Sequence, residues 1–174
     1  MTQRDDVPNC ANPPAATPER TLPPHAPACF GCGSENPAGL GLRAWRVDDE
    51  IHGEVTFKQH HSGAPTFAHG GAVATAIDDC LGFLLYLIEE PGVTARLEVD
   101  YRKPVLIETP YVLRARVDRR DGRKIFASIE MRDPNGVLAA EGTALFVTVS
   151  IEHFTRDLPQ DWKERAKELG ELPW

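Results

Sequence analysis

The segment AHGGAVATAIDDCLGFLL, residues 68–85, places a carboxylate inside an otherwise apolar helix, and this combination constrains the fold most strongly. Burying an ionised acid without a partner costs several kcal/mol of free energy, or the acid must take up a proton. The residues on the helical face of Asp78 are small and leave room for a ligand: Gly71, Ala74, Thr75 and Gly82. The pattern therefore predicts a central helix that keeps one face for a bound molecule.

His69, Gly70 and Gly71 open this helix with unhindered backbone amides. The first N–H groups of a helix have no intrahelical acceptor, and the positive end of the helix dipole favours an anion or a developing oxyanion. From Gly71 to Asp78 the helix rises roughly 10 Å. Attack on one carbonyl requires both groups at about 3 Å. We therefore expect a working site to be shared between two subunits.

Composition narrows the possible function classes. The 174 residues, 41% of them apolar, suffice for one domain with a hydrophobic core. No run approaches the length of about 18 consecutive apolar residues that a membrane span needs, and the N-terminus MTQRDDVPNC lacks the features of a secretory signal. The net charge of −7 argues against general nucleic-acid binding. We expect a cytoplasmic protein with no membrane span and no nucleic-acid partner.

Prolines and turn residues divide the chain into three parts. Residues 1–27 contain seven of the fifteen prolines and few large apolar side chains, which predicts a flexible leader. A folded domain is expected over residues 28–152. The tail, residues 153–174, has apolar residues at helical spacing and predicts a short helix without a chemical role: Trp162, Ala166 and Leu169.

Strand-like patterns surround the predicted helix, which runs over about residues 70–89. Two alternating stretches, 41–48 and 51–58, precede the helix. Four β-type runs follow: TARLEVDYRKP, PYVLRARVDRR, KIFASIEMRD and VLAAEGTALFVTVSI. Asp121-Gly122 and Pro134-Asn135-Gly136 are turn signals, so the last three runs are expected to form an antiparallel meander. This order predicts an α+β fold with a curved antiparallel sheet wrapped around one long central helix.

The cysteines and paired histidines raise the question of a metal. Cys29 and Cys32 have the spacing that zinc sites use, but a structural zinc needs four ligands. No second CxxC or HxxxH motif follows, and Cys80 lies in the apolar helix. This pattern favours a structural turn over a metal site or a redox pair. His60 and His61 predict a polar loop, since no acid or cysteine stands at ligand spacing from them. We expect no metal and no cofactor.

The motif HxGxPxxxHGG, the acid nine residues after its second histidine, the strand TARLEVDYRKP and the turn GRKIFAS occur in this order. Together they resemble the PaaI-like branch of the hotdog-fold acyl-CoA thioesterases, and within it the thioesterase-superfamily-member group. The resemblance covers about residues 29–150, including the opening segment CFGCGSENPAGLGL. It implies a hotdog fold, a homodimer or homotetramer, and hydrolysis of acyl-CoA thioesters to free acid and CoA.

The resemblance also implies roles for particular residues. Asp78 is the nucleophile or the general base that activates water, and Gly70 supplies the oxyanion amide. His69 polarises or orients the thioester, and Thr94 positions the attacking water. The CoA phosphates and pantetheine are expected near the end of the DYRKP strand and the GRK turn, at Asp100, Arg102, Arg123 and Lys124.

One position departs from the family pattern. Several members have an asparagine six residues before the histidine, where this chain has Gly63. His61 or a backbone amide is the candidate replacement in the oxyanion hole. The acyl group is expected near Thr75, Gly82 and the helix of the partner subunit.

Competing interpretations stay open for the site and for the function. Asp78 in a structural ion pair at a dimer seam, His69 as a helix cap, Thr94 as an ordinary strand residue and Asp79 as a solvated or structural acid are the plainer alternatives. The competing functions are a non-catalytic acyl-CoA or acyl-carrier-protein binding module, a hotdog hydratase or dehydratase, and a zinc-stabilised interaction protein. The acid at position 78 argues against a pure binding module, and the HGG-plus-acid layout matches the thioesterase branch better than the dehydratases.

Overall fold

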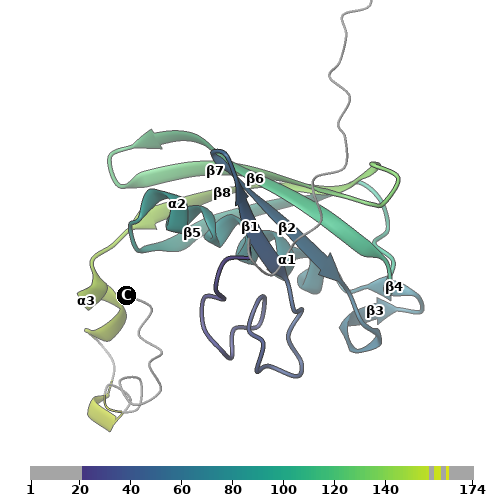
Figure 1. Cartoon of the computed structure of the whole chain (residues 1–174), viewed down its shortest axis with the longest axis horizontal. Coiled ribbons are helices and arrows are strands. Elements are labelled where there is room, and N and C mark those ends of the chain that lie inside the picture. Colours follow the sequence, from purple (N-terminus) through teal and green to yellow (C-terminus); the bar gives the residue numbers. More distant parts are fainter. Residues whose placement is uncertain (1–20, 157–158, 162–163, 165–174) are drawn as a thin grey trace, which may run out of the picture.

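A six-stranded antiparallel sheet curves around a central helix in the computed structural model, which describes residues 21–156, 159–161 and 164 (Figure 1). The strand order is β1-β2-β6-β7-β8-β5. The strands are β1 (Arg43–Val47), β2 (Glu50–Thr56), β5 (Gly92–Tyr101), β6 (Pro110–Asp121), β7 (Lys124–Arg132) and β8 (Leu138–Thr148). The predicted meander is confirmed, because β6, β7 and β8 pair in sequence order. Gly122 and Gly136, in the two predicted turns, have positive φ angles of 57° and 79°, a conformation that glycine adopts without steric cost.

Helix α1 (Gly70–Gly82) forms the centre of the fold and contacts β2 and β5 to β8. Its buried face presents apolar side chains to the sheet: Ala72, Val73, Ala76, Ile77, Cys80 and Leu81. Helix α2 (Leu84–Ile88) follows, so the single helix predicted over 70–89 is two segments divided at Phe83. The helical region ends at Glu89, which adopts a left-handed conformation, just before Pro91. The predicted α+β fold with a wrapped central helix is confirmed.

The region Gly70–Ile88 is long and apolar enough to cross a membrane by length and composition alone. A core helix satisfies the same criterion. Here α1 packs against five strands of the sheet, which is the arrangement of a core helix.

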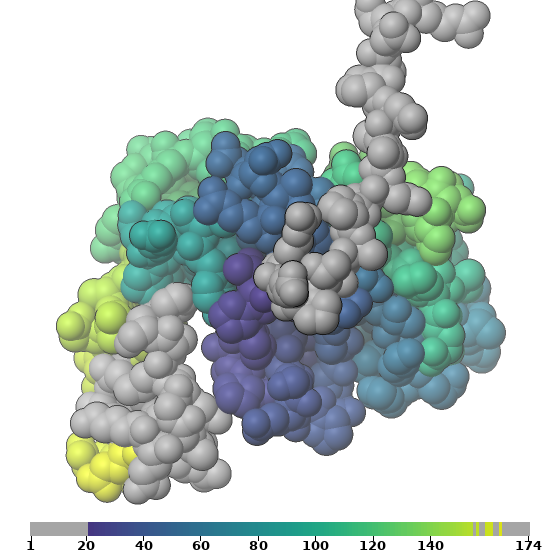
Figure 2. Space-filling view, in the orientation of Figure 1, coloured from purple at the N-terminus to yellow at the C-terminus, as the bar shows by residue number. Residues whose placement is uncertain are grey.

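The N-terminal segment described by the structure, residues 21–42, packs on the domain. Leu22 donates its backbone N–H to Ala44 O at 2.7 Å, and Thr21 forms an isolated bridge with Trp45. Residues 21–27 of the predicted leader therefore contact the domain, whereas residues 1–20 lie outside the described residues. Figure 2 shows the segment, in purple, spread over one face of the molecule.

Short elements complete the fold. They are the 3-10 helix η1 (Gln59–His61), the two-stranded sheet of β3 (Ser62–Ala64) and β4 (Phe67–Ala68), and helix α3 (Ile151–Thr155). The loop of η1, β3 and β4 leads directly into α1 and carries the first part of the HxGxPxxxHGG motif. The helix predicted around Trp162, Ala166 and Leu169 lies outside the described residues.

Candidate active site

Asp78 is half-buried on the face of α1 that the sheet leaves uncovered, and it is joined to Thr94 on the edge strand β5. The Thr94 hydroxyl donates a hydrogen bond to Asp78 Oδ1 at 3.1 Å. Burial raises the pKa of Asp78, and the hydrogen bond from Thr94 opposes this rise. A carboxylate held in this way has a fixed orientation and keeps an oxygen for a reacting partner.

The beginning of α1 is organised by His69. Its Nδ1 accepts a hydrogen bond from the Gly71 N–H at 2.9 Å, so His69 is the N-cap of the helix. Gly70 accepts a hydrogen bond from the Tyr101 hydroxyl at its carbonyl oxygen, at 2.9 Å. Among the described residues no acceptor is found for the Gly70 N–H. Of the two glycine amides, that of Gly70 is therefore the one placed to receive an oxyanion.

The two halves of this site are well separated in one chain. Gly70 and Asp78 lie eight residues apart on α1, which is about 12 Å along the helix axis. The hydrogen bond from Thr94 holds Asp78 near one end of β5, and the hydrogen bond from Tyr101 holds Gly70 near the other. One carbonyl group cannot contact both groups of the same chain.

A pocket of about 330 Å³ lies beside the start of α1. It is lined by Gly70 and Val73 of α1, Phe67 and Ala68 of β4, and residues 101–105. It therefore brings Gly70 together with two basic side chains, those of Arg102 and Lys103. The exposed aromatic rings of Phe67 and Tyr101 give it an apolar component.

The residues predicted to hold CoA fall into two groups. Arg102 bonds to Glu141 at 2.7 Å and to Asp100 at 3.3 Å, near the pocket beside Gly70. Arg123 lies in the turn between β6 and β7, and Lys124 is the first residue of β7. Lys124 pairs with Val147, whereas the Tyr101 end of β5 lies beside Ala140 and Met131. Lys124 and Met131 are seven residues apart on β7, which is about 23 Å, so the two groups of one chain cannot hold the same phosphate.

The loop before α1 explains the departure at Gly63. A Cβ at this position would lie 2.9 Å from the His69 Cα, so an asparagine does not fit without a shift of the backbone. His61 is buried, and burial lowers its pKa. Its Nδ1 accepts from the Lys58 N–H at 2.9 Å, and its Nε2 lies 3.3 Å from Ala38 O. Both ring nitrogens are thus engaged by the main chain, which favours a structural role for His61.

Thr75 and Gly82, predicted to line the acyl slot, have neighbours within the chain. Thr75 donates its hydroxyl to Gly71 O at 2.9 Å. A Cβ at Gly82 would lie 3.3 Å from Cε1 of His25, so the ring of His25 covers this glycine. The uncovered part of the small-residue face therefore extends from Gly71 to Asp78.

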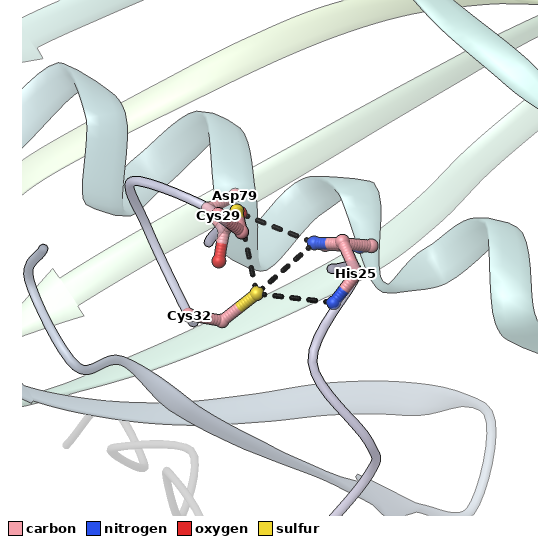
Figure 3. A group of neighbouring side chains, drawn as sticks. All are labelled: His25, Cys29, Cys32 and Asp79. Atoms are coloured by element: carbon pink, nitrogen blue, oxygen red, sulfur yellow. Dashed lines mark hydrogen bonds and ion pairs between the residues drawn. The ribbon is translucent and has the colours of Figure 1, made fainter. Parts of the chain in front are cut away.

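Asp79 belongs to a different cluster, which the sequence analysis missed (Figure 3). Its carboxylate lies beside His25, Cys29 and Cys32 of the N-terminal segment. Burial opposes a charge on His25, but hydrogen bonds to Asp79 and Cys29 outweigh it and raise the pKa of His25 to about 9. Hydrogen bonds from Cys32 and His25 lower the pKa of the Cys29 thiol. The histidine four residues before Cys29 is a signal in the sequence, whereas Asp79 is brought to the cluster only by the fold.

Comparison with known proteins identifies the domain. Residues 66–140 match the family model described as the Thioesterase superfamily. A crystal structure of a thioesterase superfamily protein superposes with a TM-score of 0.65 and 28% identity, covering 68% of this chain and 62% of that one. The chain contains a hotdog-fold domain of the thioesterase superfamily. The E. coli PaaI protein shares the fold of this domain, with a TM-score of 0.60 and 13% identity, over 64% of this chain and 81% of that one.

Curated relatives of the thioesterase domain include acyl-coenzyme A thioesterase THEM4. The Xenopus laevis protein is 36% identical over 86 residues, which are 49% of this chain and 39% of the relative. The Bos taurus protein is 30% identical over 126 residues, which are 71% of this chain and 52% of the relative. The alignments thus span about two fifths to one half of these relatives.

Proposed function

We propose that the protein is an acyl-CoA thioesterase that hydrolyses acyl-CoA to free acid and CoA. The observation that carries the proposal is the Asp78 carboxylate, half-buried on the uncovered face of α1 and held by the Thr94 hydroxyl. The curated relatives named acyl-coenzyme A thioesterase support the reaction class. The structure of a thioesterase from Streptococcus pneumoniae TIGR4 with coenzyme A, of the same fold with a TM-score of 0.59, is consistent with a CoA ligand.

Thioester hydrolysis needs little beyond the groups described above. Asp78 attacks the carbonyl carbon to form an acyl-aspartyl anhydride that water then hydrolyses, or it accepts a proton from a water molecule that attacks directly. The carbonyl oxygen gains negative charge in both routes, and the Gly70 N–H at the start of α1 stabilises it. The tetrahedral intermediate then collapses, the C–S bond breaks, and the CoA thiolate takes up a proton.

Because Gly70 and Asp78 are far apart along α1, a working site needs groups from two chains. If two α1 helices pair in an antiparallel manner, Asp78 of each chain lies beside the Gly70 amide of the other. The same pairing joins the Thr94 and Lys124 end of one sheet to the Tyr101 and Arg102 end of the other. A homodimer therefore combines the carboxylate, the oxyanion amide and both basic groups in each of its two sites. Such a dimer is also the unit from which a homotetramer would form.

This arrangement also sets the orientation of the bound acyl-CoA. We propose that the CoA nucleotide is held by the basic groups at the rim, and that the acyl chain follows the small-residue face of α1 around Thr75. Arg102 would exchange part of its pairing with Asp100 and Glu141 for phosphate.

The test is hydrolysis by the full chain of a panel of acyl-CoA thioesters, followed with a thiol-detecting dye. Asp78→Asn should keep the fold and lose at least about 100-fold in kcat, the scale expected on removing a general base or nucleophile. Asp49→Asn is the matched control, because Asp49 is fully exposed in the turn between β1 and β2. Binding of acyl-CoA without turnover would indicate a binding module instead, and hydration of enoyl-CoA without thiol release a hydratase. Equal losses in both variants would contradict the role of Asp78.

A further inference from the structure

His25, Cys29, Cys32 and Asp79 bring four metal-ligating atoms together at the contact between the N-terminal segment and α1 (Figure 3). The histidine and the cysteines come from one loop, and the carboxylate comes from the helix. All four ligand atoms lie within 4.8 Å of one another. The cluster is next to the candidate active site in sequence, but among the described residues its hydrogen bonds join it to neither Thr94 nor Gly70.

Four of the six distances between the ligand atoms are close to those of a tetrahedral ligand set. His25 Nδ1 lies 3.1 Å from Asp79 Oδ1 and 3.4 Å from Cys32 Sγ. Asp79 Oδ1 lies 3.2 Å from Cys29 Sγ and 3.7 Å from Cys32 Sγ. Zinc bonds of about 2.0 Å to nitrogen or oxygen and about 2.3 Å to sulfur give edges of about 3.3–3.8 Å in a regular tetrahedron. The ligand atoms therefore need only small shifts to surround one zinc ion.

The loop is built closely around these atoms. A Cβ at Gly31 would lie 2.2 Å from the Asp79 Cγ, and a Cβ at Gly33 would lie 2.4 Å from the Cys29 backbone nitrogen. The His25 backbone N–H donates to Cys32 Sγ at 3.2 Å, and the Gly33 N–H donates to Cys29 O at 3.0 Å. Glycine at both positions lets the backbone approach the helix and turn tightly between the two sulfurs.

Burial supplies a second, independent observation. The Asp79 side chain is only 9% exposed, and Cys32 is 8% exposed. Asp79 Oδ2 is buried and has no hydrogen-bond partner among the described residues. A buried carboxylate oxygen without a partner is costly unless a hydrogen-bond donor or a cation reaches it, and a metal ion is such a cation.

We propose that the protein binds one Zn²⁺ ion through His25, Cys29, Cys32 and Asp79. Thiolate and imidazole ligands suit zinc, whereas magnesium and calcium prefer oxygen ligands alone. Four protein ligands fill a tetrahedral site and leave no position for substrate or water, so the zinc is structural. Its role is to fasten the segment around residues 25–32 to α1. This inference does not depend on the proposed thioesterase activity.

The first experiment measures the metal content of the full chain by inductively coupled plasma mass spectrometry, after removal of any affinity tag. The wild type should carry one zinc per chain, and Cys29→Ser and Cys32→Ser should lose it. Two matched controls come from the same helix. Cys80→Ala removes a thiol outside the cluster, and Asp78→Asn removes the carboxylate next to Asp79. Asp79→Asn, in contrast, changes a ligand. Both controls should keep the zinc, and Asp79→Asn should lower the zinc affinity.

A second measurement does not require the variants to fold. X-ray absorption at the zinc edge of the wild-type protein should show two sulfur and two nitrogen or oxygen neighbours. Cobalt added to the metal-free protein under reducing conditions should produce the visible absorption of a tetrahedral thiolate site. Coordination by oxygen and nitrogen alone, or zinc retained by the double variant Cys29→Ser with Cys32→Ser, would overturn the proposal. A wild-type protein without bound metal and with a Cys29–Cys32 disulfide, recognised by its mass and its thiol count, would also overturn it.

Discussion

Asp78 and Asp79 are consecutive residues of α1, but their carboxylates bond to opposite parts of the chain. Asp78 accepts a hydrogen bond from Thr94 on β5, and Asp79 lies 3.1 Å from His25 in the N-terminal segment. Neighbouring side chains of an α-helix project about 100° apart, so one turn of α1 presents two acids to different surroundings. In our proposals Asp78 acts on the thioester, whereas Asp79 binds zinc and holds the N-terminal segment beside the same helix.

The hydrogen bond between Thr94 and Asp78 predicts a difference between two substitutions of Thr94. Thr94→Val removes the hydroxyl at nearly constant volume and should lower kcat by about tenfold or more, since hydrogen bonds to charged groups contribute about 1.5–3 kcal/mol. Thr94→Ser keeps the hydroxyl and should retain most of the activity. Steady-state kinetics on one acyl-CoA decides the matter, and equally active Val and Ser variants would mean that Thr94 is only a strand residue.

The backbone N–H of Gly70 can be eliminated by substitution without disrupting helix α1. Gly70 is the first residue of α1, where proline is well tolerated, and His69 before it already has the extended conformation that a following proline prefers. Gly70→Pro should therefore fold, as judged by circular dichroism, and lose at least about 100-fold in kcat, the scale of an oxyanion-hole donor. Gly70→Ala is the control that keeps the N–H. Its Cβ would meet the Tyr101 ring at 3.6 Å, an ordinary contact, so this variant should stay active.

The shared site can be tested by mixing these variants. Gly70→Pro and Asp78→Asn chains are each inactive in our interpretation, but a hybrid dimer has one site with an intact amide and an intact carboxylate. Mixed and exchanged subunits should therefore recover up to about one quarter of the wild-type activity, since half of the dimers are hybrids with one good site each. If exchange is demonstrated by mass spectrometry and the activity does not return, each chain builds its own site.

The basic residues predicted to hold the nucleotide make a separate prediction. The double variant Arg123→Ala with Lys124→Ala should raise KM for acyl-CoA by about tenfold or more, because charge-assisted phosphate contacts contribute about 1.5–3 kcal/mol each when well formed. It should leave kcat nearly unchanged, because these groups are remote from the carbonyl. A short acyl-pantetheine substrate, which lacks the nucleotide, is the control and should show a much smaller change. An unchanged KM for acyl-CoA would remove this turn from the site.

The fold was predictable from local patterns because each main element carries its own signal. Alternating apolar residues and Asp-Gly or Asn-Gly turns predicted β6 to β8, and the apolar run after His69 predicted α1. The division at Phe83 carries no such signal, because the apolar pattern continues through it. The proline content predicts a flexible leader over residues 1–27, yet Leu22 and His25 make contacts across the fold that composition does not record.

In the candidate site too, residues with a signal in the sequence were predictable, whereas contacts made only by the folded chain were not. The resemblance to a family predicts a role in the site for Asp78 and for Thr94, and the structure joins the two by a hydrogen bond, while their catalytic roles stay predictions. The prediction that Cys29 and Cys32 form only a structural turn rested on the number of ligand residues that motifs in the sequence reveal. It overlooked His25, four residues away, and Asp79, which lies 47 residues beyond Cys32 and reaches it only after α1 has packed.

His61 should make the stability of the protein depend on pH in a defined direction. Burial lowers the pKa of His61 below its usual value of 6.5 in the folded chain, whereas the unfolded chain takes up a proton near that value. Below about pH 6.5 the unfolded state therefore binds a proton that the folded state does not, and the free energy of unfolding falls as the pH falls.

His61→Gln cannot titrate, so its Tm should fall less steeply than that of the wild type between about pH 7 and about pH 5. His153→Gln, a change at an exposed histidine of α3, is the control and should follow the wild-type slope. Parallel Tm profiles for wild type and His61→Gln would show that the buried ring accepts a proton without cost, against the contacts that its two nitrogens make with Lys58 and Ala38.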